Sequence, residues 1–82
     1  MNTEDFNLGK ICEYLDKRDE NWIYNISFDK IEDEEWRLYI TFPTFKLMSV
    51  ELLKELEKFV KITYIDFDYE KGKGVSLECY KW

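Results

Sequence analysis

The sequence predicts an α+β fold: a single two-layer domain in which two helices cover one face of a four-stranded antiparallel sheet. Two stretches carry apolar residues at helical spacing, and four stretches alternate large apolar residues with polar ones. Turn-forming segments separate these stretches, and their order along the chain is αββαββ. A chain of 82 residues has the length of one domain. Its two αββ halves span residues 1–42 and 43–82.

A helix is expected over residues 4–18. Thr3 supplies a hydroxyl N-cap, and Glu4 and Asp5 place acids at the positive end of the helix dipole. Gly9 within the first turns costs about 1 kcal/mol relative to Ala, which predicts a weak start to this helix.

Two strands are expected next, at 21–29 and 35–42. Large apolar residues at alternate positions indicate strands with one buried face. The expected inward rows are Trp22, Tyr24, Ile26 and Phe28, and then Trp36, Leu38, Ile40 and Phe42. The charged segment 30–35 between them is expected to be the hairpin loop. Pro43 ends the second strand because proline cannot donate a ladder hydrogen bond.

The second half repeats this plan. Ser49 is expected to cap a helix over 50–60, and two further strands are expected at 62–69 and 75–82. Glycines in the segment 70–74 supply the turn between them. The expected inward rows are Thr63, Ile65, Phe67 and Tyr69, and then Val75, Leu77 and Cys79.

The first strands of the two halves share a pattern. Segments 23–29 and 62–68 both read Ile-x-x-Ile-x-Phe-Asp. Either an old duplication or the alternation common to all amphipathic hairpins explains this repeat.

One strand order joins these elements without crossed connections. The fourth strand returns between the second and the third, which gives the order 3-4-2-1 with all neighbours antiparallel. This order is a circular permutation of the ferredoxin-like βαββαβ arrangement. Two hairpins laid side by side in another order are the alternative.

The sheet face without helices is expected to be solvated. Its mixture of tyrosines, a tryptophan and acids is typical of a protein interface, because large amphipathic aromatics ringed by charge anchor contacts. The alternative explanation is the ordinary β propensity of Tyr and Trp. The residues expected on this face are Ile23, Asn25, Ser27, Asp29, Arg37, Tyr39, Thr41, Ile62, Tyr64, Asp66, Asp68, Ser76, Glu78, Tyr80 and Trp82.

The candidate partner-binding residues are acids and aromatics of this face together with the acidic hairpin. They are Asp29, Glu32, Asp33, Glu34, Glu35, Tyr39, Tyr64, Asp66, Asp68, Glu78, Tyr80 and Trp82. The acidic segment 32–35 is either a solvated turn or a set of carboxylates at phosphate-like spacing for a groove lined by Lys and Arg. The chain has 18 acids against 12 bases and a net charge of −6, which disfavours direct nucleic-acid binding and favours a basic protein partner.

Catalytic and metal-binding patterns are missing from the sequence. It contains no histidine, the commonest general base and zinc ligand. Cys12 and Cys79 fall in apolar rows, where cysteine acts as a small hydrophobe. The acidic hairpin lacks the spacing of an EF-hand loop, and segment 72–74 is too short for a phosphate-binding loop. We therefore expect neither an enzyme, a cofactor nor a bound metal.

The N-terminal segment is acidic and has no long apolar run, so the sequence predicts neither a signal peptide nor a membrane span. A cytoplasmic protein is expected. In that compartment the two cysteines are expected to be free thiols.

In size, charge and aromatic content the chain resembles the small acidic inhibitors that phages direct at host nucleases and CRISPR effectors, and also the immunity proteins of nuclease toxins. The resemblance implies an inhibitor that blocks a basic, nucleic-acid-handling partner by steric block or nucleic-acid mimicry, in the host cytoplasm if a phage encodes it. The alternative is a structural protein that forms a homodimer through its aromatic sheet face.

Overall fold

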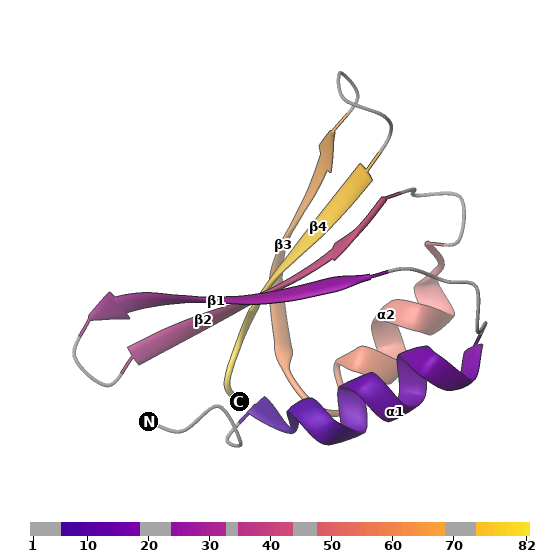
Figure 1. The fold of residues 1–82 in the computed structure, drawn as a ribbon, viewed down its shortest axis with the longest axis horizontal. Coiled ribbons are helices and arrows are strands. Elements are labelled where there is room, and N and C mark those ends of the chain that lie inside the picture. The colour runs from indigo at the N-terminus through magenta and orange to yellow at the C-terminus, as the bar shows by residue number, and fades with distance from the viewer. Residues whose placement is uncertain (1–5, 19–23, 33–34, 44–47, 69–73) are drawn as a thin grey trace.

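A computed structural model of the chain describes residues 6–18, 24–32, 35–43, 48–68 and 74–82. Within these residues, two helices cover one face of a four-stranded sheet (Figure 1). The elements in chain order are α1 (Leu8–Arg18), β1 (Asn25–Glu32), β2 (Glu35–Phe42), α2 (Val50–Leu56), β3 (Lys61–Asp68) and β4 (Gly74–Tyr80). The predicted fold class and the order αββαββ are confirmed.

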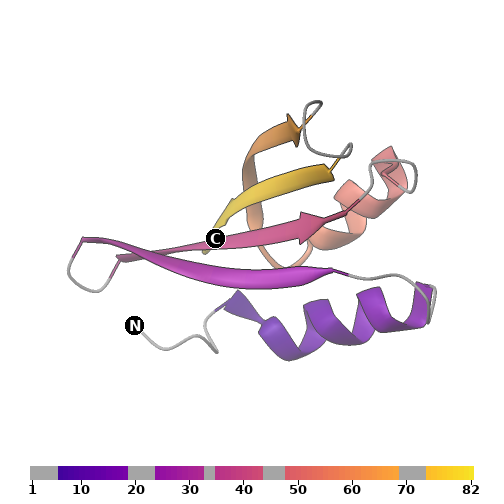
Figure 2. The same cartoon turned by 45° about the horizontal axis from the view of Figure 1, so that its top comes forward.

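The strand order is β1-β2-β4-β3, and every neighbouring pair is antiparallel. This is the predicted order, and it rules out the alternative arrangement of the two hairpins. β4 fills the position between β2 and β3, while β1 and β3 form the two edges of a strongly twisted sheet (Figures 1 and 2). The first strands of the two sequence repeats are therefore the two edge strands.

The start of α1 differs from the prediction. Within the described residues the helix begins at Leu8, because Asn7 has a left-handed backbone with φ of 55° that an α-helix cannot contain. Asparagine adopts this conformation more readily than most residues. The Asn7 carbonyl accepts hydrogen bonds from the N–H groups of Lys10 (3.0 Å) and Ile11 (3.1 Å) and so opens the helix. The predicted cap at residues 3–5 lies outside the described residues.

The predicted cap of α2 is confirmed, whereas its length is not. The Ser49 hydroxyl accepts a hydrogen bond from the N–H of Leu52 at 3.1 Å. After Leu56 the chain continues in turns, in which the N–H of Phe59 donates to the Leu56 carbonyl at 3.0 Å. The helix is therefore shorter at its C-terminal end than the apolar stripe predicts.

The core lies between the sheet and the helices. Among the described residues, the buried apolar side chains are Phe6, Ile11, Leu15, Leu38, Ile40, Phe42, Leu52, Leu56, Val60, Val75, Leu77 and Cys79. The inner strands β2 and β4 each supply three of them at alternate positions, as predicted. The inward residues of the edge strands, such as Ile26 and Ile65, are half-buried and pack against this core.

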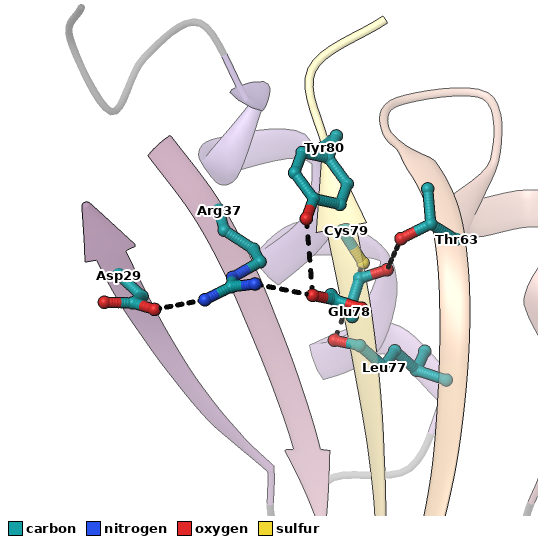
Figure 3. A network of polar contacts seen from close by, with 7 residues as sticks. All are labelled: Asp29, Arg37, Thr63, Leu77, Glu78, Cys79 and Tyr80. Carbon is teal, nitrogen blue, oxygen red and sulfur yellow. Dashed lines mark hydrogen bonds and ion pairs between the residues drawn. The ribbon is translucent and has the colours of Figure 1, made fainter. Parts of the chain in front are cut away.

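The predicted alternation is wrong at the start of β3. A β-bulge between Ile62 and Tyr64 shifts the register, so Ile62 pairs with Cys79 while Tyr64 pairs with Glu78. A bulge adds one residue to a strand and interrupts the two-residue period of its side chains. Ile62 therefore packs against the core instead of lying on the open face. Thr63 is exposed, and its hydroxyl donates to the Glu78 carbonyl at 3.2 Å (Figure 3).

The β1–β2 hairpin is longer than predicted. Pairing continues past Lys30, which faces Trp36, to Glu32, which faces Glu35, with a bulge in between. The segment expected as a loop is thus largely strand. The prediction ended the strand too early because a run of charged residues is typical of a loop. The hairpin extends beyond both helices (Figures 1 and 2).

Leu77→Ala is expected to lower the free energy of unfolding by about 2–5 kcal/mol, because truncation leaves a cavity in the core. Leu77 is fully buried between Ile40 and Ile65 in the pairing of the inner sheet. Urea unfolding measures the loss. The control Val50→Ala, at an exposed helix position, should change stability by no more than about 0.5 kcal/mol. Equal effects of the two variants would contradict this core.

Candidate protein interface

The cross-strand register arranges the open face in rows that run across the strands. One row contains Ser27, Tyr39, Glu78 and Tyr64, and a neighbouring row contains Asn25, Thr41, Ser76 and Asp66. Further along, Asp29 faces Arg37, and Tyr80 faces Lys61. The structure thus brings most of the predicted open-face residues together on one surface.

Arg37 links three strands of this face (Figure 3). Its Nη2 donates to Oδ2 of Asp29 at 2.5 Å, and its Nη1 donates to Oε1 of Glu78 at 2.9 Å. The Tyr80 hydroxyl donates to the same Glu78 oxygen at 3.3 Å. One guanidinium on an inner strand therefore holds a carboxylate on β1 and another on β4.

The Arg37 guanidinium also stacks over an aromatic ring. Its Cζ lies 5.3 Å from the ring centroid of Tyr39, within the range of a cation–π interaction. Hydrogen bonding to Asp29 is the main cause that raises the pKa of Arg37 further above its usual range. The Arg37 side chain is only 26% exposed. The middle of the open face is therefore occupied by a charged side chain that forms two ion pairs and one cation–π contact.

These ion pairs change the predicted acidity of the face. Asp29 and Glu78 were both candidate partner-binding acids, and both now have Arg37 as an internal counter-ion. The sequence contained the signal for this, since Arg37 is the one base among the residues predicted for the face. What the sequence lacked was the register that places Arg37 between these two carboxylates.

Three acids of β1, β2 and β3 have no ion pair within the described part of the chain. Asp66, Glu32 and Glu35 are exposed, and Glu32 lies directly opposite Glu35 in the hairpin. The alternation along β2 places Glu35 on the same face as Arg37. Asp33 and Glu34 lie outside the described residues, as does the side chain of Asp68, whose backbone ends β3.

A small hollow lies beside Asp66. It has a volume of about 180 Å³ and is also lined by Thr41, Gly74, Val75 and Ser76. The hydroxyls of Thr41 and Ser76 are 3.2 Å apart and share a hydrogen bond. A carboxylate next to two hydroxyl acceptors suits an ammonium or guanidinium group from a partner.

The predicted aromatics are not equally available to a partner. Tyr64 is 59% exposed, whereas Tyr39 and Tyr80 are half-buried and engaged by the Arg37 network. The prediction that Trp82 belongs to the open face is wrong, because the strand alternation ends with β4 at Tyr80. The Trp82 indole N–H instead donates to the Glu57 carbonyl of the helix layer at 2.8 Å.

A second, shallow hollow of about 340 Å³ lies on the helix side, where α1 meets the turn before β3. It is lined by Lys10, Glu13, Tyr14, Lys17 and Phe59. Sequence reasoning did not single out these residues. Lys17 pairs with Glu13 at 2.8 Å, and this contact lowers the pKa of Glu13. Two of the charged side chains that line this hollow, Lys17 and Glu13, are thus paired with each other.

Both cysteines are free thiols, as predicted. Burial, reinforced by the charge of Glu78, raises the pKa of Cys79 to about 12. The Cys79 thiol is therefore protonated at neutral pH and packs as a small apolar group. In the described residues no group of three or more His, Cys, Asp or Glu side chains is arranged to hold a metal ion.

Comparisons with protein-family models, with curated proteins and with solved structures found no match to this chain. The helices in the described part of the chain are too short or too polar to span a lipid bilayer.

Stability is expected to fall as the pH rises from 9.0, the ordinary pKa of the thiol, towards about 12, its pKa in the fold. Below pH 9.0 Cys79 is protonated in both the folded and the unfolded state, and its contribution to stability is fully present. Above pH 9.0 the thiol of the unfolded state loses its proton while the folded thiol keeps it, so the unfolded state is favoured and stability falls. The shift corresponds to roughly 4 kcal/mol at most. Burial raises the pKa of Tyr24 as well and adds a loss of the same sign.

Urea unfolding at increasing pH measures this dependence. Cys79→Ala, although less stable at neutral pH, should show a flatter decline in the alkaline range. The same slope in both proteins would contradict a protonated, buried Cys79.

Proposed function

We propose that this chain is a small acidic protein-binding inhibitor that blocks a basic, nucleic-acid-handling partner. The observation that carries the proposal is the division of charge on the open face. Arg37 is the shared counter-ion of Asp29 and Glu78, while Glu32, Glu35 and Asp66 remain exposed at opposite ends of the same face. These carboxylates can meet cations of a partner.

The hairpin pair gives the proposal an energetic basis. Like charges directly opposite one another in antiparallel strands destabilise the pair. Glu32 and Glu35 occupy such positions in a hairpin that extends beyond the helices (Figure 1). A Lys or Arg side chain bound between them would remove this repulsion, so a cationic partner gains from a contact that is unfavourable in the free protein.

The dimensions of the face suit a nucleic-acid-binding groove. Residues 35 and 41 of β2 are separated by about 20 Å at the usual rise per residue, and Thr41 lies in the row of Asp66. Proteins that bind nucleic acids line their grooves with Lys and Arg that neutralise phosphates. Carboxylates at both ends of the face would bind these Lys and Arg side chains in place of phosphates. Alternatively, the sheet would block the groove sterically. This action fits a cytoplasmic inhibitor of the phage anti-CRISPR or anti-defence type, or an immunity protein.

Self-association through the aromatic face is a second candidate function. The observation that favours it is the exposure of Tyr64 near the β3 edge. Tyr39 and Tyr80 contribute less area, since the Arg37 network already engages them.

The test is affinity capture from a lysate of the native host, with the parent protein and the double variant Glu35→Lys/Asp66→Lys. The parent should retain a basic nucleic-acid-binding protein at low salt and release it at high salt, because salt screens ionic contacts. The variant should lose most of this capture. Added nucleic acid should compete with the parent for the purified partner.

The matched control is Glu51→Lys/Glu57→Lys, which changes the net charge equally through two exposed positions of the helix layer. It should capture the partner like the parent, and circular dichroism should show that both variants fold. If both variants lost capture of the partner equally, the effect would come from net charge alone, which would contradict a specific role of Glu35 and Asp66. A salt-insensitive partner, or one that binds nucleic acid and the chain together, would contradict the proposed inhibition.

A further inference from the structure

We propose that the chain forms a two-fold dimer in which the β3 edges of two copies pair antiparallel. The result is one continuous sheet of order β1-β2-β4-β3 followed by the same strands of the second copy in reverse. In the described part of the chain, β3 pairs with β4 alone and its outer side is a sheet edge. This inference deepens the second candidate function, self-association, and does not depend on the proposed inhibition of a basic partner.

The two edges of the sheet differ in their protection against pairing. Soluble proteins blunt edge strands with charges, bulges and short lengths. β1 exposes the polar residues Asn25, Ser27 and Asp29, and its one exposed large apolar side chain among the described residues is Ile31, at 38%. β3 instead exposes large aromatic surface: Tyr64 is 59% exposed and Phe67 39%. The bulge of β3 lies between Ile62 and Tyr64, near the start of the strand. The five residues from Tyr64 to Asp68 therefore pair regularly with β4.

The β3 sequence is complementary to itself when the two-fold axis passes through Ile65. Antiparallel pairing about this point sets Ile65 against its own copy and Tyr64 against Asp66, whose carboxylate can accept the phenol hydrogen bond. The bulged Thr63 advances the register by one residue. Ile62 then faces Phe67: Ile62 packs against the core, and Phe67, which pairs with the buried Val75, is 39% exposed.

Charge supports the same register. Beyond Ile62, Lys61 comes opposite the backbone position of Asp68, so residues of opposite sign are in register at both ends of the paired strands. Centring the axis on Asp66 would set that carboxylate against itself. Centring it on Tyr64 would set Ile65 against Thr63. The register centred on Ile65 is therefore the favoured one.

The geometry of such a dimer is closed. A two-fold axis perpendicular to the sheet uses the same edge in both copies and leaves no further β3 edge for growth. Both helical layers then lie on one side, and both open faces lie on the other. The outer edges of the combined sheet are the two β1 strands.

The experiment is light scattering after size-exclusion chromatography, over a concentration series. The parent should approach the mass of two chains. Tyr64→Asp sets a carboxylate against Asp66 at two symmetric places, and should raise the dimer dissociation constant at least about tenfold. Adding Asp66→Lys to that variant sets opposite charges against each other and should restore the dimer. Ser27→Asp, a charge added at the β1 edge, should leave the mass unchanged.

Circular dichroism establishes that each variant is folded before its mass is interpreted. A parent that stays monomeric at its solubility limit would overturn the proposal. So would a dimer that survives Tyr64→Asp, or one that Ser27→Asp dissociates. Failure of Asp66→Lys to restore a folded dimer would overturn the register through Ile65.

Discussion

The open face of this sheet depends on one side chain, Arg37. A guanidinium in the middle of a half-buried surface needs counter-ions, and Asp29 and Glu78 supply them from the strands on either side. Arg37 also rests on the Tyr39 ring, which orients its planar fork. Its Nε is buried and has no hydrogen-bond partner in the described residues, so the network carries a cost that its other contacts must offset. The two carboxylates lie near each other because Arg37 lies between them.

This pairing divides the surface into a centre whose two carboxylates share one counter-ion and ends whose acids have no ion pair among the described residues. Asp29 and Glu78 are both engaged by Arg37, so the middle of the face has a net charge of −1 in place of −2. Glu32, Glu35 and Asp66 keep their charge for outside contacts. The exposed aromatic surface lies to one side, along the β3 edge at Tyr64. A partner that recognises charge and a second copy that pairs with an edge strand can therefore use different parts of the same sheet.

The sequence predicted the layers, the element order and the strand order, because apolar periodicity and short connections leave few solutions for this chain. It failed where backbone detail decides the outcome. The positive φ of Asn7 moved the start of α1, and the bulge at Thr63 turned Ile62 towards the core. For the candidate site, alternation placed most residues on the correct face. Alternation carries no information on cross-strand register, so the pairing of Arg37 with Asp29 and Glu78 required the structure.

The central role of Arg37 is tested most directly by a double-mutant cycle between Asp29→Asn and Arg37→Met, measured by urea unfolding. A second cycle pairs Arg37→Met with Glu78→Gln. Asp29→Asn should lower the free energy of unfolding when Arg37 is present, because a charged hydrogen bond is lost. In the Arg37→Met background the same change should be neutral or stabilising, because it removes one of two neighbouring carboxylates that lack a counter-ion. An equal effect of Asp29→Asn in both backgrounds would contradict the central role of Arg37.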